Sequence, residues 1–165
     1  MTAQPGPHRA YVGLGSNLED PAAQIRAALA ALDRLPGTRV RRASRLYRTP
    51  PWGLTEQPEF VNAVAELDTA LAPDELFDAL QALERAAGRA RQVRWGPRVL
   101  DLDLLAFDAL QSAEPALRLP HPHLHERAFV LVPLLELAPD LVLPGHGTVH
   151  ELAARVDCSG IQALG

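Results

Sequence analysis

The chain has 165 residues, 47% hydrophobic and 22% charged, a length and composition typical of one globular domain. Its net charge of −4 argues against general nucleic-acid binding, and all 16 basic residues are arginine, which excludes a lysine Schiff base and a Walker-type phosphate loop. The single cysteine, Cys158, excludes an internal disulfide framework and a cysteine-cluster metal site. Because no apolar run approaches a membrane span and no signal peptide is evident, we expect a reducing, cytoplasmic setting.

The pattern of apolar residues predicts two β-α-β units in succession. Strands are predicted where apolar residues alternate or run together, and helices where they recur every 3.6 residues between proline and glycine signals. The predicted elements are a strand at Ala10–Leu14, a helix at Pro21–Leu35 capped by Asn17 or Asp20, strands at Val40–Tyr47 and Phe60–Leu67, a helix at Asp74–Ala87 and a strand at Val99–Phe107. This order is typical of the α+β class and, within it, of a ferredoxin-like split βαβ sandwich.

The remaining segments are predicted to be a tail, two loops and a C-terminal extension. The polar residues 1–9 predict a disordered tail before a single domain over 10–165. Consecutive prolines predict a loop at Thr49–Gly53, and the absence of an apolar period predicts another at Arg89–Arg98. The extension is predicted to contain a turn at Pro120–Pro122, a helix at Glu126–Leu137 interrupted by Pro133 and a closing helix at Thr148–Val156.

A group of arginines directly precedes two carboxylates. Five arginines fall within 14 residues, without an acidic residue among them: Arg85, Arg89, Arg91, Arg94 and Arg98. Asp101 and Asp103 follow on a predicted strand, where the period of two places both side chains on one face. Such carboxylates suit a Mg²⁺ ion that shares its ligands with substrate phosphates, which the arginines would hold. The alternative is a solvated strand face beside an exposed basic loop.

Three further motifs are less specific. Gly13-Leu14-Gly15 lacks the third glycine of a dinucleotide fingerprint and favours a tight strand-to-helix turn. The histidines of His121–His125 lack zinc-ligand spacing, so we expect one of them to donate a hydrogen bond to a phosphate or hydroxyl instead. Phe60 shares a predicted strand face with Asn62, and an aromatic plane beside an amide suits a heterocycle, although Phe60 and Phe129 are ordinary core aromatics in the simpler interpretation.

Several motifs, taken in order, resemble one enzyme family. They are Gly15-Ser16-Asn17-Leu18, Tyr47-Arg48-Thr49-Pro50-Pro51, Phe60-Val61-Asn62-Ala63, Gly88-Arg89, Arg94-Trp95-Gly96-Pro97-Arg98-Val99-Leu100-Asp101-Leu102-Asp103, Pro120-His121 and Arg127-Ala128-Phe129-Val130-Leu131. In this order and nearly this spacing, they resemble the 6-hydroxymethyl-7,8-dihydropterin pyrophosphokinases of folate biosynthesis. The resemblance covers about Tyr11 to Leu143.

This resemblance implies transfer of the β,γ-pyrophosphoryl group of ATP to the hydroxymethyl oxygen of the pterin, with release of AMP. Asp101 and Asp103 match the ligands of two Mg²⁺ ions, and with Arg89 and Arg98, which match phosphate-clamping arginines, they form the implied catalytic set. The implied nucleotide contacts are Gln81, Glu84, Arg89, Arg91, Trp95, Arg98, His121 and Arg127. The implied pterin contacts are Thr49, Pro51, Phe60, Asn62, Trp95 and Phe129, with the two phenylalanines enclosing the ring.

The chain departs from the family pattern in the outer phosphate shell. Ala116 stands where some relatives have a phosphate-contacting arginine, while Arg118 lies two residues on. We expect a monomer that acts on ATP and the pterin, with no nucleic-acid or membrane partner. We also expect the segments Thr49–Phe60 and Arg89–Arg98 to close as lids. The alternative is a ferredoxin-like RNA-binding or regulatory ligand-binding module, which requires aromatic residues exposed on a basic sheet face.

Overall fold

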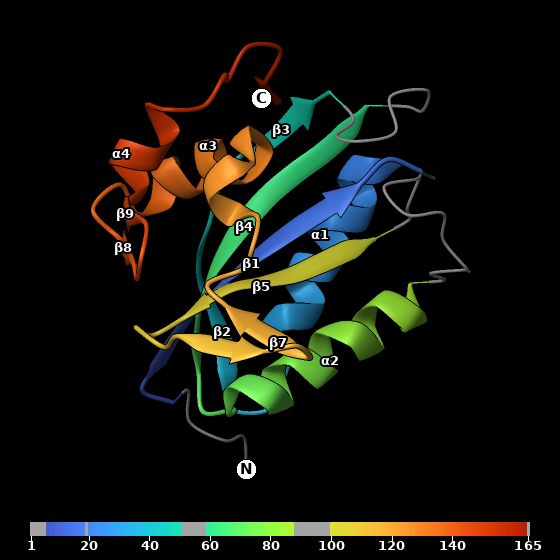
Figure 1. Cartoon of the computed structure of the whole chain (residues 1–165). Helices are drawn as coiled ribbons and strands as arrows, with labels where there is room; N and C mark the ends of the chain where they lie inside the picture. The colour runs from blue at the N-terminus through green and yellow to red at the C-terminus, as the bar shows by residue number, and fades with distance from the viewer. Residues whose placement is uncertain (1–5, 19, 51–58, 88–99, 165) are drawn as a thin grey trace.

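A computed structural model describes residues 6–18, 20–50, 59–87 and 100–164. Within these ranges, a six-stranded antiparallel sheet lies between two layers of helices (Figure 1). The strands of this sheet are β1 (His8–Ser16), β2 (Thr38–Ala43), β3 (Leu46–Thr49), β4 (Phe60–Thr69), β5 (Asp101–Phe107) and β10 (Gln162–Leu164). The helices are α1 (Pro21–Asp33), α2 (Pro73–Ala86), α3 (Ala128–Leu137) and α4 (Val149–Ala153). None of these helices has the length and apolar character needed to cross a membrane.

The central strand β1 is antiparallel to β4 on one side and to β5 on the other. The sheet order is β10-β3-β4-β1-β5, and β2 also pairs with β4. In this register Gly15 lies opposite both Asn62 of β4 and Asp101 of β5. The central strand therefore brings residues from distant motifs to one level of the sheet.

The alternation of side chains along β4 divides the core in two. Val64 faces α3 and α4, where it packs with Leu131 and Leu152. The other face of β4 packs with Ile25 of α1 and with Leu76 of α2, through the side chains of Val61, Ala63, Ala65 and Leu67. Figure 1 shows these two helix pairs on opposite sides of the sheet. The predicted alternation over Phe60–Leu67 is thus confirmed.

The predicted strand at Val40–Tyr47 is wrong as a single element, because β2 and β3 are separated at Ser44. The backbone N–H of Val64 donates to Oγ of Ser44 at 2.9 Å, and the Ser44 N–H donates to the Val64 carbonyl at 2.9 Å. A hydroxyl thus replaces one backbone acceptor of the ladder, which allows the chain to bend without leaving a buried donor unsatisfied.

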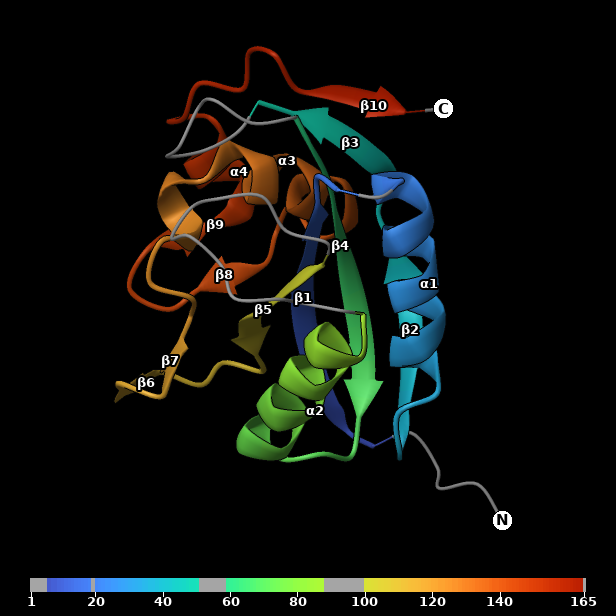
Figure 2. The same cartoon turned by 90° about the vertical axis from the view of Figure 1, so that its right-hand side faces the viewer.

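The ends of the chain also differ from the predictions. β1 begins at His8, so His8 and Arg9 belong to the sheet and not to the tail, and the Arg9 N–H donates to Oδ1 of Asp108 at 2.8 Å. The last strand, β10, was not predicted, because three residues show no readable period. It pairs with β3, as Figure 2 shows at the edge of the sheet.

The predictions for the rest of the C-terminal half are only partly correct. The predicted interruption at Pro133 is wrong: Pro133 lies inside α3, where burial of one apolar helix outweighs the missing hydrogen bond. Helix α4 is shorter than predicted, and a 3₁₀ turn at Leu124–Glu126 precedes α3. Two small hairpins were missed, formed by β6 (Ser112–Glu114) with β7 (Leu117–Leu119) and by β8 (Val142–Leu143) with β9 (Gly147–Thr148).

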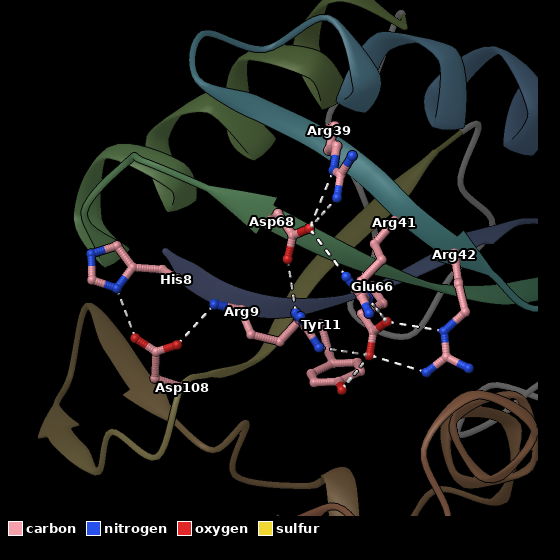
Figure 3. Close-up of polar contacts among 9 residues, drawn as sticks. All are labelled: His8, Arg9, Tyr11, Arg39, Arg41, Arg42, Glu66, Asp68 and Asp108. Atoms are coloured by element: carbon pink, nitrogen blue, oxygen red, sulfur yellow. Dashed lines mark hydrogen bonds and ion pairs between the residues drawn. The ribbon is translucent and has the colours of Figure 1, made fainter. Parts of the chain in front are cut away.

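A buried carboxylate joins β1, β2 and β4. Glu66 is 1% exposed, and it accepts hydrogen bonds from the Tyr11 hydroxyl at 2.6 Å and from Nε of Arg42 at 3.0 Å (Figure 3). The guanidinium groups of Arg9 and Arg41 lie 3.5 and 3.4 Å from the same carboxylate. Burial alone would raise the pKa of Glu66, but the hydrogen bonds from Arg42 and Tyr11 outweigh it and hold the pKa below its ordinary value.

The contacts around Glu66 also change the pKa of Tyr11 and connect β2 to α3. Burial, and then the hydrogen bond to Glu66, raise the pKa of Tyr11 to about 12. Nη2 of Arg42 also donates to the Leu137 carbonyl at 2.7 Å, which fixes the C-terminal end of α3 to β2. The network therefore links the sheet to the helix that covers one of its faces.

We expect Glu66→Gln to lower the free energy of unfolding by about 1–3 kcal/mol at neutral pH, because the amide leaves the Arg42 guanidinium without its carboxylate. The deficit should be complete above the unfolded-state carboxyl pKa of about 4.3 and should shrink as the pH falls through the lowered pKa of the folded protein. Urea unfolding of both proteins across a pH series measures it. Glu114→Gln, at an exposed position, is the control, and a deficit independent of pH would contradict the prediction.

Candidate active site

One cavity of about 310 Å³ lies where the two helix layers approach the end of the sheet. Its walls come from β1, β3, β4, β5, α2 and α3 and from the segment before α3. Every predicted site residue that the structure describes lines this cavity: Thr49, Phe60, Asn62, Gln81, Glu84, Asp101, Asp103, His121, Arg127 and Phe129. The structure therefore brings together residues that the sequence separates by up to 80 positions, from Thr49 to Phe129.

The other predicted site residues lie outside the described ranges. These are Pro51, Arg89, Arg91, Trp95 and Arg98. Residues 51–58 of one predicted lid loop and the whole of the other, Arg89–Arg98, also lie outside the described ranges. Within the described part of the chain, neither Ala116 nor Arg118 is among the residues that line the cavity.

The floor of the cavity depends on the missing side chain of Gly15. A Cβ atom at Gly15 would lie 2.7 Å from Oδ1 of Asn62, far inside van der Waals contact, and 3.8 Å from Cδ1 of Phe60. The Asn62 carboxamide thus occupies the space that a side chain on β1 would fill. Its Nδ2 donates to Oγ1 of Thr49 at 2.6 Å, and both residues are buried. These contacts hold the amide in one orientation.

Asp101 and Asp103 enter the cavity from β5, on either side of the buried Leu102. Oε2 of Glu84, a buried residue of α2, accepts a hydrogen bond from the Leu102 N–H at 2.8 Å. This bond replaces a ladder partner at the outer edge of β5 and fixes the strand against α2. Glu84 therefore holds in place the strand that carries both aspartates.

Two cationic or donor groups face Asp103. Nη1 of Arg127 lies 3.9 Å from Oδ2, and Nε2 of His121 lies 4.0 Å from Oδ1. Burial, and then the positive charge of Arg127, lower the pKa of His121 to about 4, so its ring is neutral at neutral pH. Because Nδ1 of His121 accepts from the His123 N–H at 3.3 Å, the proton of the neutral ring is assigned to Nε2. His121 thus presents an N–H donor beside the aspartate.

The two aspartates fit a Mg²⁺ ion better than a structural metal site. Mg²⁺ is commonly bound by one or two carboxylates, with substrate phosphates and water as the other ligands. Within the described ranges, no group of three or more histidine, cysteine, aspartate or glutamate residues is placed to hold a metal ion. An ion bound by Asp101 and Asp103 would therefore need the ligands that a phosphate supplies.

Some of the cavity residues carry no signal in the sequence that was recognised. The predicted tight turn at Gly13–Gly15 is wrong, because β1 continues to Ser16 and both glycines lie within it. Their spacing of two was the available signal, since it places both on one face of a strand. Phe77 and Val130 also line the cavity, but their periodic apolar positions are those of ordinary core residues.

Comparison with known proteins identifies close relatives over almost the whole chain. The family model described as 7,8-dihydro-6-hydroxymethylpterin-pyrophosphokinase matches residues 11–139. The 2-amino-4-hydroxy-6-hydroxymethyldihydropteridine pyrophosphokinase of Pseudomonas aeruginosa is 54% identical over 156 residues, which cover 94% of this chain and 96% of that protein. The protein of the same name from Methylorubrum extorquens is 51% identical, with coverages of 94% and 98%.

Solved structures share the fold. The crystal structure of wild-type Plasmodium falciparum HPPK-DHPS with SDX-DHP has a TM-score of 0.68 and 13% sequence identity, over 90% of this chain. The chain spans 43% of that protein, so the likeness concerns the fold of one part of it. With the family model covering well over half of the sequence and relatives above 50% identity, the chain belongs to the 7,8-dihydro-6-hydroxymethylpterin-pyrophosphokinase family.

Proposed function

We propose that the cavity is the active site of a pyrophosphokinase of folate biosynthesis, at which the β,γ-pyrophosphoryl group of ATP passes to the hydroxymethyl oxygen of 6-hydroxymethyl-7,8-dihydropterin. The main support for this proposal is that ten residues, predicted from separate parts of the sequence to form the site, line one cavity. A cavity of this size that combines aromatic walls with a few fixed polar groups is typical of a small-molecule site.

The pterin end of the site is formed by Asn62, Thr49 and the two aromatic rings. Since Nδ2 of Asn62 is held by Thr49, the amide presents a fixed pattern of donor and acceptor to the edge of a flat heterocycle. Phe60 and Phe129 supply apolar surface for the faces of that ring. The guanidinium carbon of Arg127 lies 5.6 Å from the centre of the Phe129 ring. A positive charge therefore lies beside the Phe129 ring, between the aromatic residues and the proposed phosphate end.

The phosphate end is formed by Asp101, Asp103, His121 and Arg127. A pair of Mg²⁺ ions bound to the aspartates would neutralise the triphosphate and charge that develops during transfer. Arg127 places a charged donor, and His121 a neutral one, beside the same carboxylate, where both can bind phosphate oxygens. Arg89, Arg98, Arg91 and Trp95 complete our proposal for the nucleotide side. Little covalent work is required of the protein, whose role is to position the two substrates.

We also propose that the core is a ferredoxin-like sandwich. The strand order β5-β1-β4, followed by β2 and β3, and the packing of α1 and α2 on one sheet face support this assignment. RNA recognition by such a sheet requires an open face, whereas in the described part of the chain helices cover both faces. The enzyme is therefore favoured over the RNA-binding module.

The first test is the product of the reaction. With ATP, Mg²⁺ and 6-hydroxymethyl-7,8-dihydropterin, we expect AMP to accumulate in equal amount to the pterin consumed, and chelation of Mg²⁺ to stop turnover. Chromatography of the nucleotides distinguishes AMP from ADP. A reaction without pterin is the control. ADP in equal amount to the pterin would mean transfer of one phosphoryl group and would exclude pyrophosphoryl transfer.

The aspartates are tested by Asp101→Asn and Asp103→Asn. Each should lower kcat by at least about a thousandfold, because charge stabilisation at the phosphates is lost. Thermal stability should fall much less than turnover, since removing one of two like charges on a strand face relieves repulsion, although Asp103→Asn also removes the ion pair with Arg127. Asp108→Asn is the matched control, because Asp108 follows the same strand but binds His8 and Arg9 outside the cavity. Turnover close to wild type in either cavity variant would contradict the metal role.

The close approach at Gly15 predicts a selective effect on pterin binding. Gly15→Ala should raise the KM for pterin by about tenfold and change that for ATP much less, because its Cβ displaces the Asn62 amide. Gly13→Ala is the matched comparison: its Cβ would lie 3.4 Å from Leu105, an ordinary contact, and its effect should be much smaller. Steady-state kinetics with each substrate varied in turn measures both. Similar effects of the two variants would contradict the role assigned to the Asn62 amide.

A further inference from the structure

Glu136 lies near the C-terminal end of α3, and its carboxylate binds several donors of the bend between β2 and β3. The Tyr47 hydroxyl donates to Oε1 at 2.5 Å. The backbone N–H of Arg45 lies 3.2 Å from Oε1 and 3.1 Å from Oε2, and Nε of Arg45 lies 3.4 Å from Oε1. One side chain of α3 therefore binds both the backbone and the side chains of the segment that leads into β3.

These contacts satisfy polar groups at the break between β2 and β3, where backbone pairing with β4 is interrupted. β2 pairs with β4 as far as Ala43, and pairing of β3 with β4 includes Tyr47 opposite Asn62, so the N–H of Arg45 falls at the break between the two strands. Tyr47 is 5% exposed, which means that its hydroxyl needs a partner within the protein. Glu136 supplies the acceptor for both groups.

The position of Tyr47 is coupled to the pterin end of the cavity. Tyr47 lies opposite Asn62 in the register, and Thr49, two residues further along β3, accepts the hydrogen bond from the Asn62 amide. Tyr47 and Thr49 are both buried, so neither has room to move independently of the strand. A shift of Tyr47 would therefore move Thr49 and change the orientation of the Asn62 amide.

The other end of α3 is also part of the cavity. Phe129 and Val130 of its first turn line the wall, and Arg127 directly precedes it. The helix has 10 residues and is thus about 15 Å long. Its buried face packs on β4, and Arg42 holds the Leu137 carbonyl at the same end as Glu136. Since a helix transmits displacement along its length, the contacts at one end help to set the place of Phe129 at the other.

We propose that Glu136 is a positioning residue for pterin recognition. Its contacts fix the separation between β3 and α3. At this separation the Thr49–Asn62 pair and the Phe129 ring can contact the same heterocycle. Glu136 itself is not among the residues that line the cavity. The inference rests on the proposed function of the cavity. The positioning role requires an acceptor oxygen at the position of Oε1, which accepts hydrogen bonds from the Tyr47 hydroxyl and the Arg45 N–H. It does not require the negative charge of the carboxylate.

The test compares equilibrium binding of the two substrates by isothermal titration calorimetry. The pterin is titrated into protein saturated with Mg²⁺ and a non-hydrolysable ATP analogue, and the analogue alone is titrated with Mg²⁺. Glu136→Ala should raise the Kd of the pterin by about tenfold and that of the analogue by less than about twofold. Glu136→Gln should restore pterin binding to within about twofold of wild type, because its amide oxygen replaces Oε1.

Tyr47→Phe keeps the ring in the core and removes only the hydroxyl, so it tests the proposal even where Glu136→Ala fails to fold. It should weaken pterin binding selectively, and its effect should not add to that of Glu136→Ala, because both remove the same contact. Additive effects would show that the two residues act separately and would overturn the proposal.

Glu151→Ala is the matched control for general destabilisation. The Glu151 carboxylate likewise accepts a backbone N–H and a hydroxyl, both from Thr148, at 3.0 and 2.9 Å, but on α4 and outside the cavity. It should lower the melting temperature and leave the ratio of the two Kd values unchanged. Equal weakening of both ligands by Glu136→Ala, or a selective effect of Glu151→Ala, would overturn the positioning role alone. Wild-type protein that binds no pterin would overturn the proposed function as well.

Discussion

The arrangement of the site depends on the central strand β1, and above all on the absence of a side chain at Gly15. The register puts this glycine between Asn62 on one neighbouring strand and Asp101 on the other. Because nothing projects from β1 at this level, the Asn62 amide oxygen occupies the space above Gly15, while Nδ2 of the same amide donates to Thr49 of β3, on the other side of β4. The proposed pterin end and the proposed phosphate end can thus share one cavity.

Charge is distributed very differently at the two ends of the sheet. Glu66 is buried and neutralised by surrounding arginines, so its contribution is to stability. Asp101 and Asp103 face a cavity, where Nη1 of Arg127 lies 3.9 Å from Oδ2 of Asp103. Two carboxylates on one strand face repel each other, and a cation bound between them would relieve that repulsion. The contrast fits the structural role of Glu66 and the metal-binding role that we propose for the two aspartates.

The sequence was sufficient for the order of the core elements and for the faces of β4 and β5, because long runs with a period of two or 3.6 leave little choice. It was insufficient for β10 and the two small hairpins, whose strands of two or three residues have no period to read. The bend at Ser44 depends on a hydroxyl that meets Val64 only after folding. Ten of the residues lining the cavity were predicted through the family resemblance, and others were missed. The roles of Glu84 and Glu136 in holding β5 and β3 depend on contacts between segments distant in the chain, which the sequence does not show.

The contacts that stabilise the fold and those that shape the site meet in α3. Its C-terminal end is fixed to the sheet by Arg42 and Glu136, and its N-terminal end lines the cavity through Phe129. The helix is buried and apolar, so packing alone fixes its face but leaves sliding along its axis less restricted. Directional hydrogen bonds at one end supply that restriction. These bonds also fix the place of Phe129 at the other end, the residue for which we propose stacking on a heterocycle.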